Sequence, residues 1–252
     1  MSTLEMLTLR LRRQELTRDD GGRAVWRTLT GEDVIPARAV GILVCDVWDQ
    51  HWCRGAEERV DAMAARINEL LQAARGRGVL IIHSPSDTMD FYAGNQARER
   101  VWEAPRVPLP EEREHIDPPL PIDDSDRGCD TKETVEYRVW HRQHRAIHID
   151  EDQDFITDEG QQVYSIIIKR NIRRLLYVGV HTNMCILNRG FGIKQMVRWG
   201  VPVALVRDLT DAMYNPAKPP YVSHDEGTQL VVGFIEKFWC PSVSSEDLIA
   251  AL

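Results

Sequence analysis

The chain begins with stretches in which apolar and polar residues alternate. Residues 3–31 contain two such runs, "LTLRLRRQEL" and "RAVWRTLT", separated by "DDGG". Alternation with a period of two is typical of strands, and an Asp-Gly-Gly turn between two such runs favours a hairpin. We therefore predict an N-terminal β-hairpin extension over residues 1–37, placed before the main domain.

Beyond this extension the pattern changes to buried strands that alternate with helices. Nearly continuous apolar runs at 40–48, 79–85, 173–180 and 202–210 predict strands that are covered on both faces. Apolar residues at helical spacing predict helices over 55–78, 156–171, 185–200 and 223–239. This order is typical of an α/β fold in which helices cover both sides of a mostly parallel sheet. The main domain is expected to cover residues 38–252.

Residues 86–140 interrupt this alternation. They contain the proline-rich strings "APRVPLP" and "DPPLPIDDSD" and show little periodicity. We expect a long irregular insertion at about 86–140. Long irregular segments of this kind usually serve as functional lids or contact surfaces.

Composition and charge exclude several classes of protein. The 252 residues carry a formal net charge of −8, and no basic patch favours a nucleic acid or an anionic membrane as partner. The N-terminus lacks the continuous apolar core of a signal peptide, and no apolar run reaches the roughly 20 residues of a membrane span. The five scattered cysteines form no CxxC pair, which argues against a zinc ribbon or a disulfide framework. A cytoplasmic location is expected.

Two residues at strand ends are candidates for chemistry, because ligands of parallel sheets bind beyond the carboxyl ends of the strands. Cys185 follows "RLLYVGV" at the start of a predicted helix, where free N–H groups favour a thiolate and lower the thiol pKa. Alternatively, it packs as a small apolar residue. Asp46 ends the first buried strand and could accept the thiol proton as a general base, or anchor the following loop. An aspartyl nucleophile of the phosphatase type is rejected, since Trp48 occupies the place of its second aspartate.

The strings "GILVCDVWDQHW", "VLIIHS", "GVHTNMC" and "VRDLTDAM" together resemble the isochorismatase-like cysteine hydrolase superfamily, which includes nicotinamidases. The resemblance covers roughly residues 38–240. It implies a Rossmann-like three-layer fold with about six mostly parallel strands, and a homo-oligomer. It also implies that Asp46 is the catalytic aspartate and Cys185 the nucleophile. In addition, it implies a cis peptide bond between Val180 and His181 and an oxyanion hole formed by the amides of His181 and Cys185.

The sequence departs from the family in two respects. The segment "EYRVWHRQHRAIHI", which corresponds to the region of the family's catalytic lysine, contains no lysine. Arg142 or His141 could supply a positive charge instead, although Arg142 could equally be a loop-anchoring residue. The nicotinamidase Asp-x-His metal motif is also missing. His51, His83 and Asp87 could converge on a metal, but such scattered residues more often anchor loops. We predict no metal and no other cofactor.

Further residues near the predicted strand ends are candidates for substrate contacts. These are Trp48, His51, His83, Tyr92 and Thr182, although the aromatic ones could instead belong to the core or to a subunit contact. We expect a small-molecule substrate and a hydrolase that cleaves the C–N bond of a small amide, imide or ureido compound through a thioester. One alternative is a catalytically inactive protein that serves in ligand binding or assembly. Another is vinyl-ether hydrolysis of the isochorismatase type, which does not need the thiol.

Overall fold

The computed structural model describes residues 5–103 and 106–252. In this part of the chain eight strands form one sheet in the order β2-β1-β8-β7-β6-β3-β4-β5. The strands are β1 (Met6–Arg18), β2 (Ala24–Pro36), β3 (Val40–Cys45), β4 (Leu80–Ser84), β5 (Phe155–Ile156), β6 (Arg174–Val180), β7 (Val203–Asp211) and β8 (Ser242–Val243). The strands β3 to β8 pair in parallel, whereas β1 is antiparallel to both of its neighbours. The predicted α/β fold is confirmed, and the hairpin adds two strands to the six expected.

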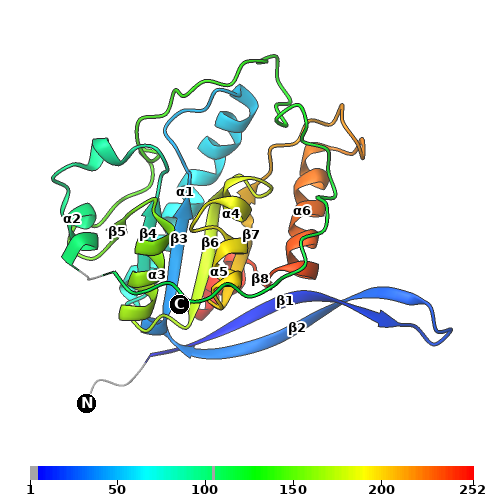
Figure 1. The fold of residues 1–252 in the computed structure, drawn as a ribbon, viewed down its shortest axis with the longest axis horizontal. Coiled ribbons are helices and arrows are strands. Elements are labelled where there is room, and N and C mark those ends of the chain that lie inside the picture. Colours follow the sequence, from blue (N-terminus) through cyan, green and yellow to red (C-terminus); the bar gives the residue numbers. More distant parts are fainter. Residues whose placement is uncertain (1–4, 104–105) are drawn as a thin grey trace.

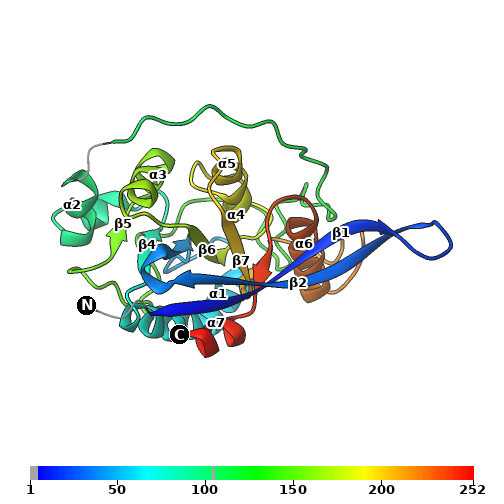
Figure 2. The same ribbon diagram turned by 90° about the horizontal axis from the view of Figure 1, so that it is seen from below.

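Helices cover both faces of the parallel strands, as Figures 1 and 2 show. Their bounds are α1 (Arg54–Gly76), α2 (Gln96–Glu103), α3 (Gly160–Lys169), α4 (Cys185–Asn188), α5 (Ile193–Arg198), α6 (His224–Phe238) and α7 (Ser245–Ala251), with 3-10 turns η1 (Ala37–Ala39) and η2 (Met89–Tyr92). Residues of α1 and α7 share one hydrophobic cluster with the sheet, and residues of α3 to α6 share another. The result is the predicted three-layer arrangement.

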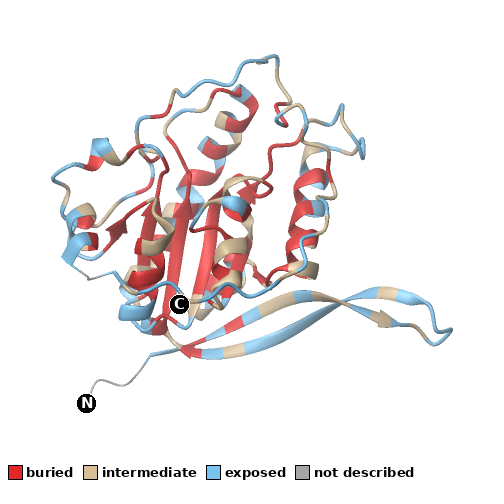
Figure 3. Ribbon diagram, viewed as in Figure 1, coloured by how far each residue is buried: buried red, intermediate tan, exposed pale blue. Residues whose placement is uncertain are grey.

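The strand β3 illustrates why its sequence is almost entirely apolar. All six of its residues are buried. Leu43 and Cys45 point into the cluster below α3 to α6, while Ile42 and Val44 point into the cluster below α1 and α7, because successive side chains of a strand face opposite sides. Figure 3 shows the same burial across the central strands and contrasts it with the largely exposed hairpin.

Three predicted elements differ from the structure. Residues 185–200 form two short helices, α4 and α5, rather than one. The backbone is extended at Arg189 and again at Gly192, which ends α4 and separates it from α5, and a Cβ at Gly192 would lie only 2.8 Å from the Leu187 carbonyl oxygen. Residues 155–156 form the edge strand β5 ahead of α3 instead of starting a helix. The segment 136–149, whose alternating apolar and polar residues favour an extended strand, makes only an isolated bridge between Trp48 and Gln143 in the described residues.

The hairpin and the insertion lie at the periphery of this core. β1 and β2 pair over thirteen residues each, and Figure 1 shows them extending past the body of the molecule. Residues 1–4 of the predicted extension and 104–105 of the predicted insertion lie outside the described residues. The insertion carries η2 and α2, and its remaining described residues run irregularly to β5.

Candidate active site

The three strand ends singled out by the sequence meet at one edge of the sheet. β3 lies between β4 and β6, and Cys45 is in register with Ser84 on one side and Gly179 on the other. Asp46 therefore follows the central strand, flanked by the residues that follow β4 and β6. Cys185 is the first residue of α4, which begins five residues after β6.

Asp46 is completely buried, and both of its carboxylate oxygens are bound. Oδ1 accepts a hydrogen bond of 2.7 Å from the Ser86 backbone N–H, and Oδ2 accepts one of 2.9 Å from Nε of Arg189. The Cys185 thiol lies beside this carboxylate, close enough for each group to perturb the pKa of the other. A buried carboxylate is costly unless it is paired, and these partners hold Asp46 facing the sulfur.

The cation beside Asp46 is Arg189, and the prediction that Arg142 fills this place is wrong. Arg142 donates through Nε to the Gln143 carbonyl oxygen at 3.3 Å, and its guanidinium lies 4.7 Å from the centre of the Phe91 ring. The backbone N–H of Arg142 donates to Asp49, which fixes the loop. Arg142 therefore has the loop-anchoring role that the sequence left open.

Arg189 directly follows the nucleophile's own short helix, α4, and lies far in sequence from the segment that corresponds to the family's lysine. Its N–H donates to the Cys185 carbonyl oxygen at 3.1 Å, so the two residues are one helical turn apart. Residues four positions apart lie on the same side of a helix. The string "CILNR" therefore already places an arginine on the same side as Cys185. It lies outside the segment that corresponds to the family's lysine.

Charge and burial shift the pKa values of this group of residues. Burial raises the pKa of Asp46, and the positive charge of Arg189 partly offsets that rise. Burial, followed by the charge of Asp46, also raises the pKa of the Cys185 thiol. The expectation of a lowered thiol pKa is therefore wrong, because burial and the neighbouring carboxylate outweigh the dipole of a helix of only four residues. Burial lowers the pKa of Arg189, but the charges of Asp46 and Cys185 together with the hydrogen bond to Asp46 outweigh this effect and raise the pKa overall.

Backbone N–H groups face the same sulfur. The backbone of His181 makes a hydrogen bond to the Cys185 sulfur that lowers the thiol pKa. In the described chain, neither the His181 nor the Cys185 N–H donates to a backbone carbonyl. The peptide bond between Val180 and His181 is cis, as the resemblance implies. Two amide donors next to a thiol are the arrangement that stabilises a tetrahedral oxyanion.

Aromatic side chains cover the sulfur. Trp48 and Trp140 stack with ring centres 4.3 Å apart, and Cys185 packs against the hydrophobic cluster that contains them. His51 stacks on both tryptophans and lies 4.9 Å from the His181 ring. Burial lowers the pKa of His51 to about 4 and that of His181 to about 3, so both imidazoles are neutral at pH 7. Trp140 was missed, because it lies in the insertion, far from the other site residues in sequence.

The other predicted substrate contacts have structural partners. His83 is buried, and its two ring nitrogens contact Gln143 at 2.9 Å and Asp154 at 2.8 Å. The Tyr92 hydroxyl accepts the Gln143 backbone N–H at 2.8 Å. The Thr182 hydroxyl lies 2.7 Å from that of Thr210. These three side chains hold loops around the site, while Trp48 and His51 lie next to the sulfur.

A network of charged residues lies beyond the end of β7. Asp211 pairs with Nε2 of His224, the first residue of α6, and with Nε of Arg59 on α1, each at 2.9 Å. Arg59 also binds Asp130 of the insertion at 2.8 Å. The network therefore joins two helices and the insertion next to the site. No local pattern predicts this network, because its three segments are far apart in the chain.

Cys53 and Cys129 form a disulfide in the structure, contrary to the expectation from their scattered positions. They are separated by 76 residues, and only the path of the insertion brings them together at the start of α1. Glu133 lies 3.6 Å from the Cys129 sulfur, and within the described ranges these three side chains form the one group with metal-ligand spacing. His51, His83 and Asp87 do not form such a group there.

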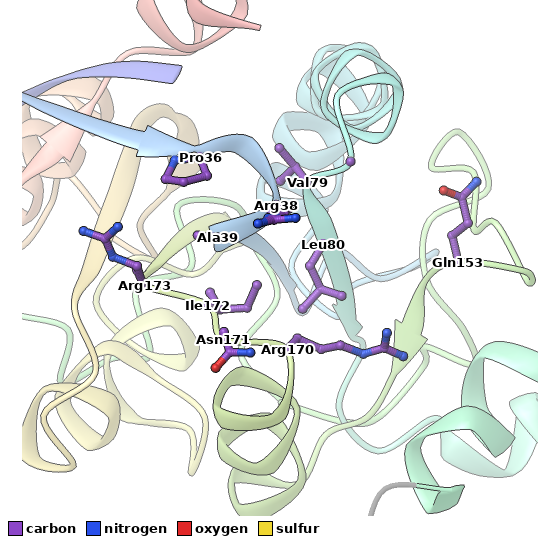
Figure 4. A pocket seen from close by; sticks show the side chains of 11 residues that line it. Pro36, Arg38, Ala39, Val79, Leu80, Gln153, Arg170, Asn171, Ile172 and Arg173 are labelled. Carbon is purple, nitrogen blue, oxygen red and sulfur yellow. The ribbon is translucent and has the colours of Figure 1, made fainter. Parts of the chain in front are cut away.

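A hollow at the opposite end of the strands contains none of the predicted site residues. Its volume is about 580 Å³, and its lining includes Arg38, Arg170, Ile172 and Arg173. Figure 4 shows these three arginine side chains pointing in different directions rather than toward one point. The hollow offers no nucleophile, so the candidate active site remains the edge that holds Asp46 and Cys185. No helix in the described ranges is long and apolar enough to cross a membrane.

The sequence matches no protein-family model and no curated protein. The structure is similar to a cysteine hydrolase from Pseudomonas syringae pv. phaseolicola 1448A, with a TM-score of 0.54 and 16% identity over 86% of this chain and 93% of that one. It is also similar to an isochorismatase from Pseudomonas putida KT2440, with a TM-score of 0.50 and 12% identity over 84% of this chain and 91% of that one. The chain therefore has the fold of the isochorismatase-like cysteine hydrolases.

Proposed function

We propose that this protein is a cysteine hydrolase that cleaves the C–N bond of a small amide, imide or ureido substrate. The observation that carries the proposal is the position of Asp46, held by the Ser86 N–H and by Arg189 beside the Cys185 thiol. A nucleophile next to a base that is itself oriented by a third group is the arrangement that activates a thiol. The fold is consistent with this chemistry.

In the first half of the reaction Asp46 takes the proton of Cys185, and the sulfur attacks the substrate carbonyl carbon. The amides of His181 and Cys185 donate to the oxyanion that forms. Asp46 then returns its proton to the substrate nitrogen, the C–N bond breaks, and the amine or ammonia leaves behind a thioester. The raised pKa of Asp46 makes it a stronger base than an exposed aspartate.

In the second half a water molecule attacks the thioester. Asp46 takes a proton from this water, the C–S bond breaks, and the proton returns to the sulfur as the carboxylic acid leaves. Arg189 keeps its own proton throughout, because arginine stays charged in proteins and the pKa of this one is raised further. Its role is to orient Asp46, so every proton transfer passes through a single carboxylate.

The surroundings of the sulfur favour a planar and uncharged substrate. Stacked Trp48 and Trp140 offer flat apolar surface, and the neutral rings of His51 and His181 supply no charge. Trp140 Nε1 and His181 Nε2 are buried without a hydrogen-bond partner. Buried polar atoms normally have partners, so these two are available to the polar groups of a substrate.

The alternative of an inactive binding protein rested on the missing lysine. Arg189 supplies a positive charge at Asp46, so the absence of lysine no longer favours that alternative. Vinyl-ether hydrolysis of the isochorismatase type does not need the Cys185 thiol. A variant without this thiol therefore distinguishes that reaction from the proposed C–N bond cleavage.

The proposal is tested by the variant Cys185→Ala. With a panel of small amides, imides and carbamoyl compounds, we expect the wild type to release ammonia or amine and the variant to lose this activity entirely. Quenched wild-type reactions should contain an acyl adduct on Cys185 by mass spectrometry. Cys240→Ala, at a buried cysteine in the core, serves as the control and should stay active. Undiminished activity of Cys185→Ala would refute the nucleophile.

A further inference from the structure

The strand β2 forms one edge of the sheet, and the structure gives its outer side no strand to pair with in the described residues. Nine of its thirteen residues are exposed. Figure 1 shows the hairpin of β1 and β2 along the lower side of the molecule, and Figure 3 shows the exposed character of β2. Such an edge presents unpaired backbone N–H and C=O groups to the solvent.

Natural proteins normally protect edge strands with charged side chains, especially lysines, or with prolines or bulges, and β2 has only the three charged residues Arg27, Glu32 and Asp33 for this purpose. Its sequence "AVWRTLTGEDVIP" contains no lysine, and its proline is the last residue. Its pairing with β1 continues over thirteen positions without a shift in register. Two large apolar side chains on the strand, Trp26 and Val34, are 41% and 56% exposed. A long, regular and partly apolar edge is suited to pairing with another strand.

The sequence of β2 is complementary to itself when two copies run antiparallel with Thr30 opposite its own copy. Trp26 then lies opposite Val34, and Arg27 lies opposite Asp33. Each pair occurs twice, once on either side of a two-fold axis, as in an isologous dimer. Directly opposed apolar or oppositely charged side chains stabilise a pair of antiparallel strands.

Neighbouring registers lose these pairs. Two residues that oppose each other in the dimer must have their side chains on the same face of the sheet. Because side chains alternate between faces, the partner of a given residue can change only in steps of two residues. One step in one direction places Trp26 opposite Glu32, and one step in the other places it opposite Pro36. Arg27 faces Gly31 or Ile35 in these cases. The apolar and the charged match therefore occur together only in the register centred on Thr30.

We propose that two copies of this chain associate through antiparallel pairing of their β2 strands in this register. The two eight-stranded sheets then become one continuous sheet, with each hairpin lying along the partner. This interface is independent of the proposed hydrolase activity, because β2 contributes no residue to the candidate active site.

Disulfide trapping tests the register directly. Opposed Cα atoms in an antiparallel pair are about 4.5–5.5 Å apart, which suits a disulfide. Thr30→Cys should therefore give a covalent dimer under mild oxidation. Thr28→Cys is the matched control, at an equally exposed threonine of the same strand. Its two copies would be offset by four residues, roughly 14 Å, and should not cross-link. Cross-linking of Thr28→Cys equal to that of Thr30→Cys overturns the proposed register.

Sedimentation velocity over a range of concentrations tests the association itself. We expect the wild type to dimerise, and Val34→Lys to shift the equilibrium to monomer at least tenfold. Ile168→Lys, at a similarly exposed residue of α3, should dimerise as the wild type does, and circular dichroism should show that both variants are folded. A wild type that stays monomeric, or a dimer that Val34→Lys leaves unchanged, overturns the proposal.

Discussion

At the scale of single residues, the chemistry depends on what surrounds Asp46. Its carboxylate is buried, so its orientation and its proton affinity are both set by Ser86, Arg189 and Cys185. The pair of Arg189 and Asp46 differs from a surface ion pair, because one partner is fully buried and the other is about one third exposed. Removing one member of such a pair leaves the other without compensation.

We predict that Arg189→Gln lowers kcat/KM about 10- to 100-fold, as expected for the loss of a charged hydrogen bond of about 1.5–3 kcal/mol. Arg189→Lys keeps the charge but has a different geometry, and it should retain more activity than the glutamine variant. Steady-state kinetics on the best substrate of the panel checks both. Arg142→Gln is the control and should stay within about threefold of the wild type, since Arg142 contacts Phe91 and a backbone carbonyl rather than Asp46. A larger loss for Arg142→Gln than for Arg189→Gln would reverse the assignment.

The pH dependence of kcat/KM should report the same carboxylate. Asp46 must be ionised to act as a base, and its pKa is raised by burial, so activity should fall on acidification at a pH above the ordinary aspartate value of about 3.9. In Arg189→Gln the charge that lowers this pKa is absent, and the acidic limb should move to higher pH. A pH–rate profile of both proteins checks this. An unchanged limb in Arg189→Gln would contradict the role given to Arg189.

The sequence was sufficient to place single positions at strand ends, but not to name the charged partner of Asp46. Asp46 and Cys185 are candidates because each follows an apolar strand, a feature that the sequence displays directly, and the structure places them side by side. Arg142 was wrong because the position of a long, flexible side chain depends on the loop that carries it. Here that loop is held by Asp49, a contact between distant segments that no local pattern reveals.

At the scale of elements, the N-terminus of α6 links secondary structure to the site. Ser223 caps the helix by accepting from the Glu226 N–H, and the Glu226 carboxylate accepts from the Ser223 N–H in return. The first residue of the helix, His224, then binds Asp211 at the end of β7. The helix predicted over 223–239 from its apolar spacing begins at this cap, and residues 223–226 form a capping box.

We predict that Ser223→Ala lowers the free energy of unfolding by about 1 kcal/mol, or the Tm by about 2–4 °C for a chain of this size. The reason is that an N–H in the first turn of α6 loses its acceptor. Ser223→Asp replaces one good capping residue by another and should keep most of the stability. Urea and thermal unfolding check both variants. Equal stability of Ser223→Ala and the wild type would show that the cap contributes nothing.

At the scale of the whole molecule, contacts between residues far apart in sequence hold the structure together. The disulfide between Cys53 and Cys129 is the contact with the clearest effect on stability. It connects the insertion to α1, next to the aromatic cluster that covers Cys185. Arg59 makes a parallel connection by binding Asp130 and Asp211. The insertion therefore forms part of the wall of the candidate site.

We predict that reduction of the disulfide lowers the free energy of unfolding by about 2–4 kcal/mol, because the unfolded chain regains the freedom of a long loop. The double variant Cys53→Ala/Cys129→Ala should be less stable than the wild type and insensitive to reductant. Unfolding with and without reductant checks this, and Cys240→Ala should keep the wild-type response. A wild type whose stability is the same with and without reductant would show that the bond adds none.

The sequence by itself determined the order of most strands and helices, the buried character of the central strands and the position of the candidate residues Asp46 and Cys185 at strand ends, because these depend on local periodicity and on position within an element. Tertiary structure decided the rest. The break between α4 and α5, the choice of Arg189 over Arg142, the raised thiol pKa and the approach of Cys129 to Cys53 all depend on neighbours that are brought together only by folding. Burial and pairing are properties of the packed chain, and a pattern along one segment does not contain them.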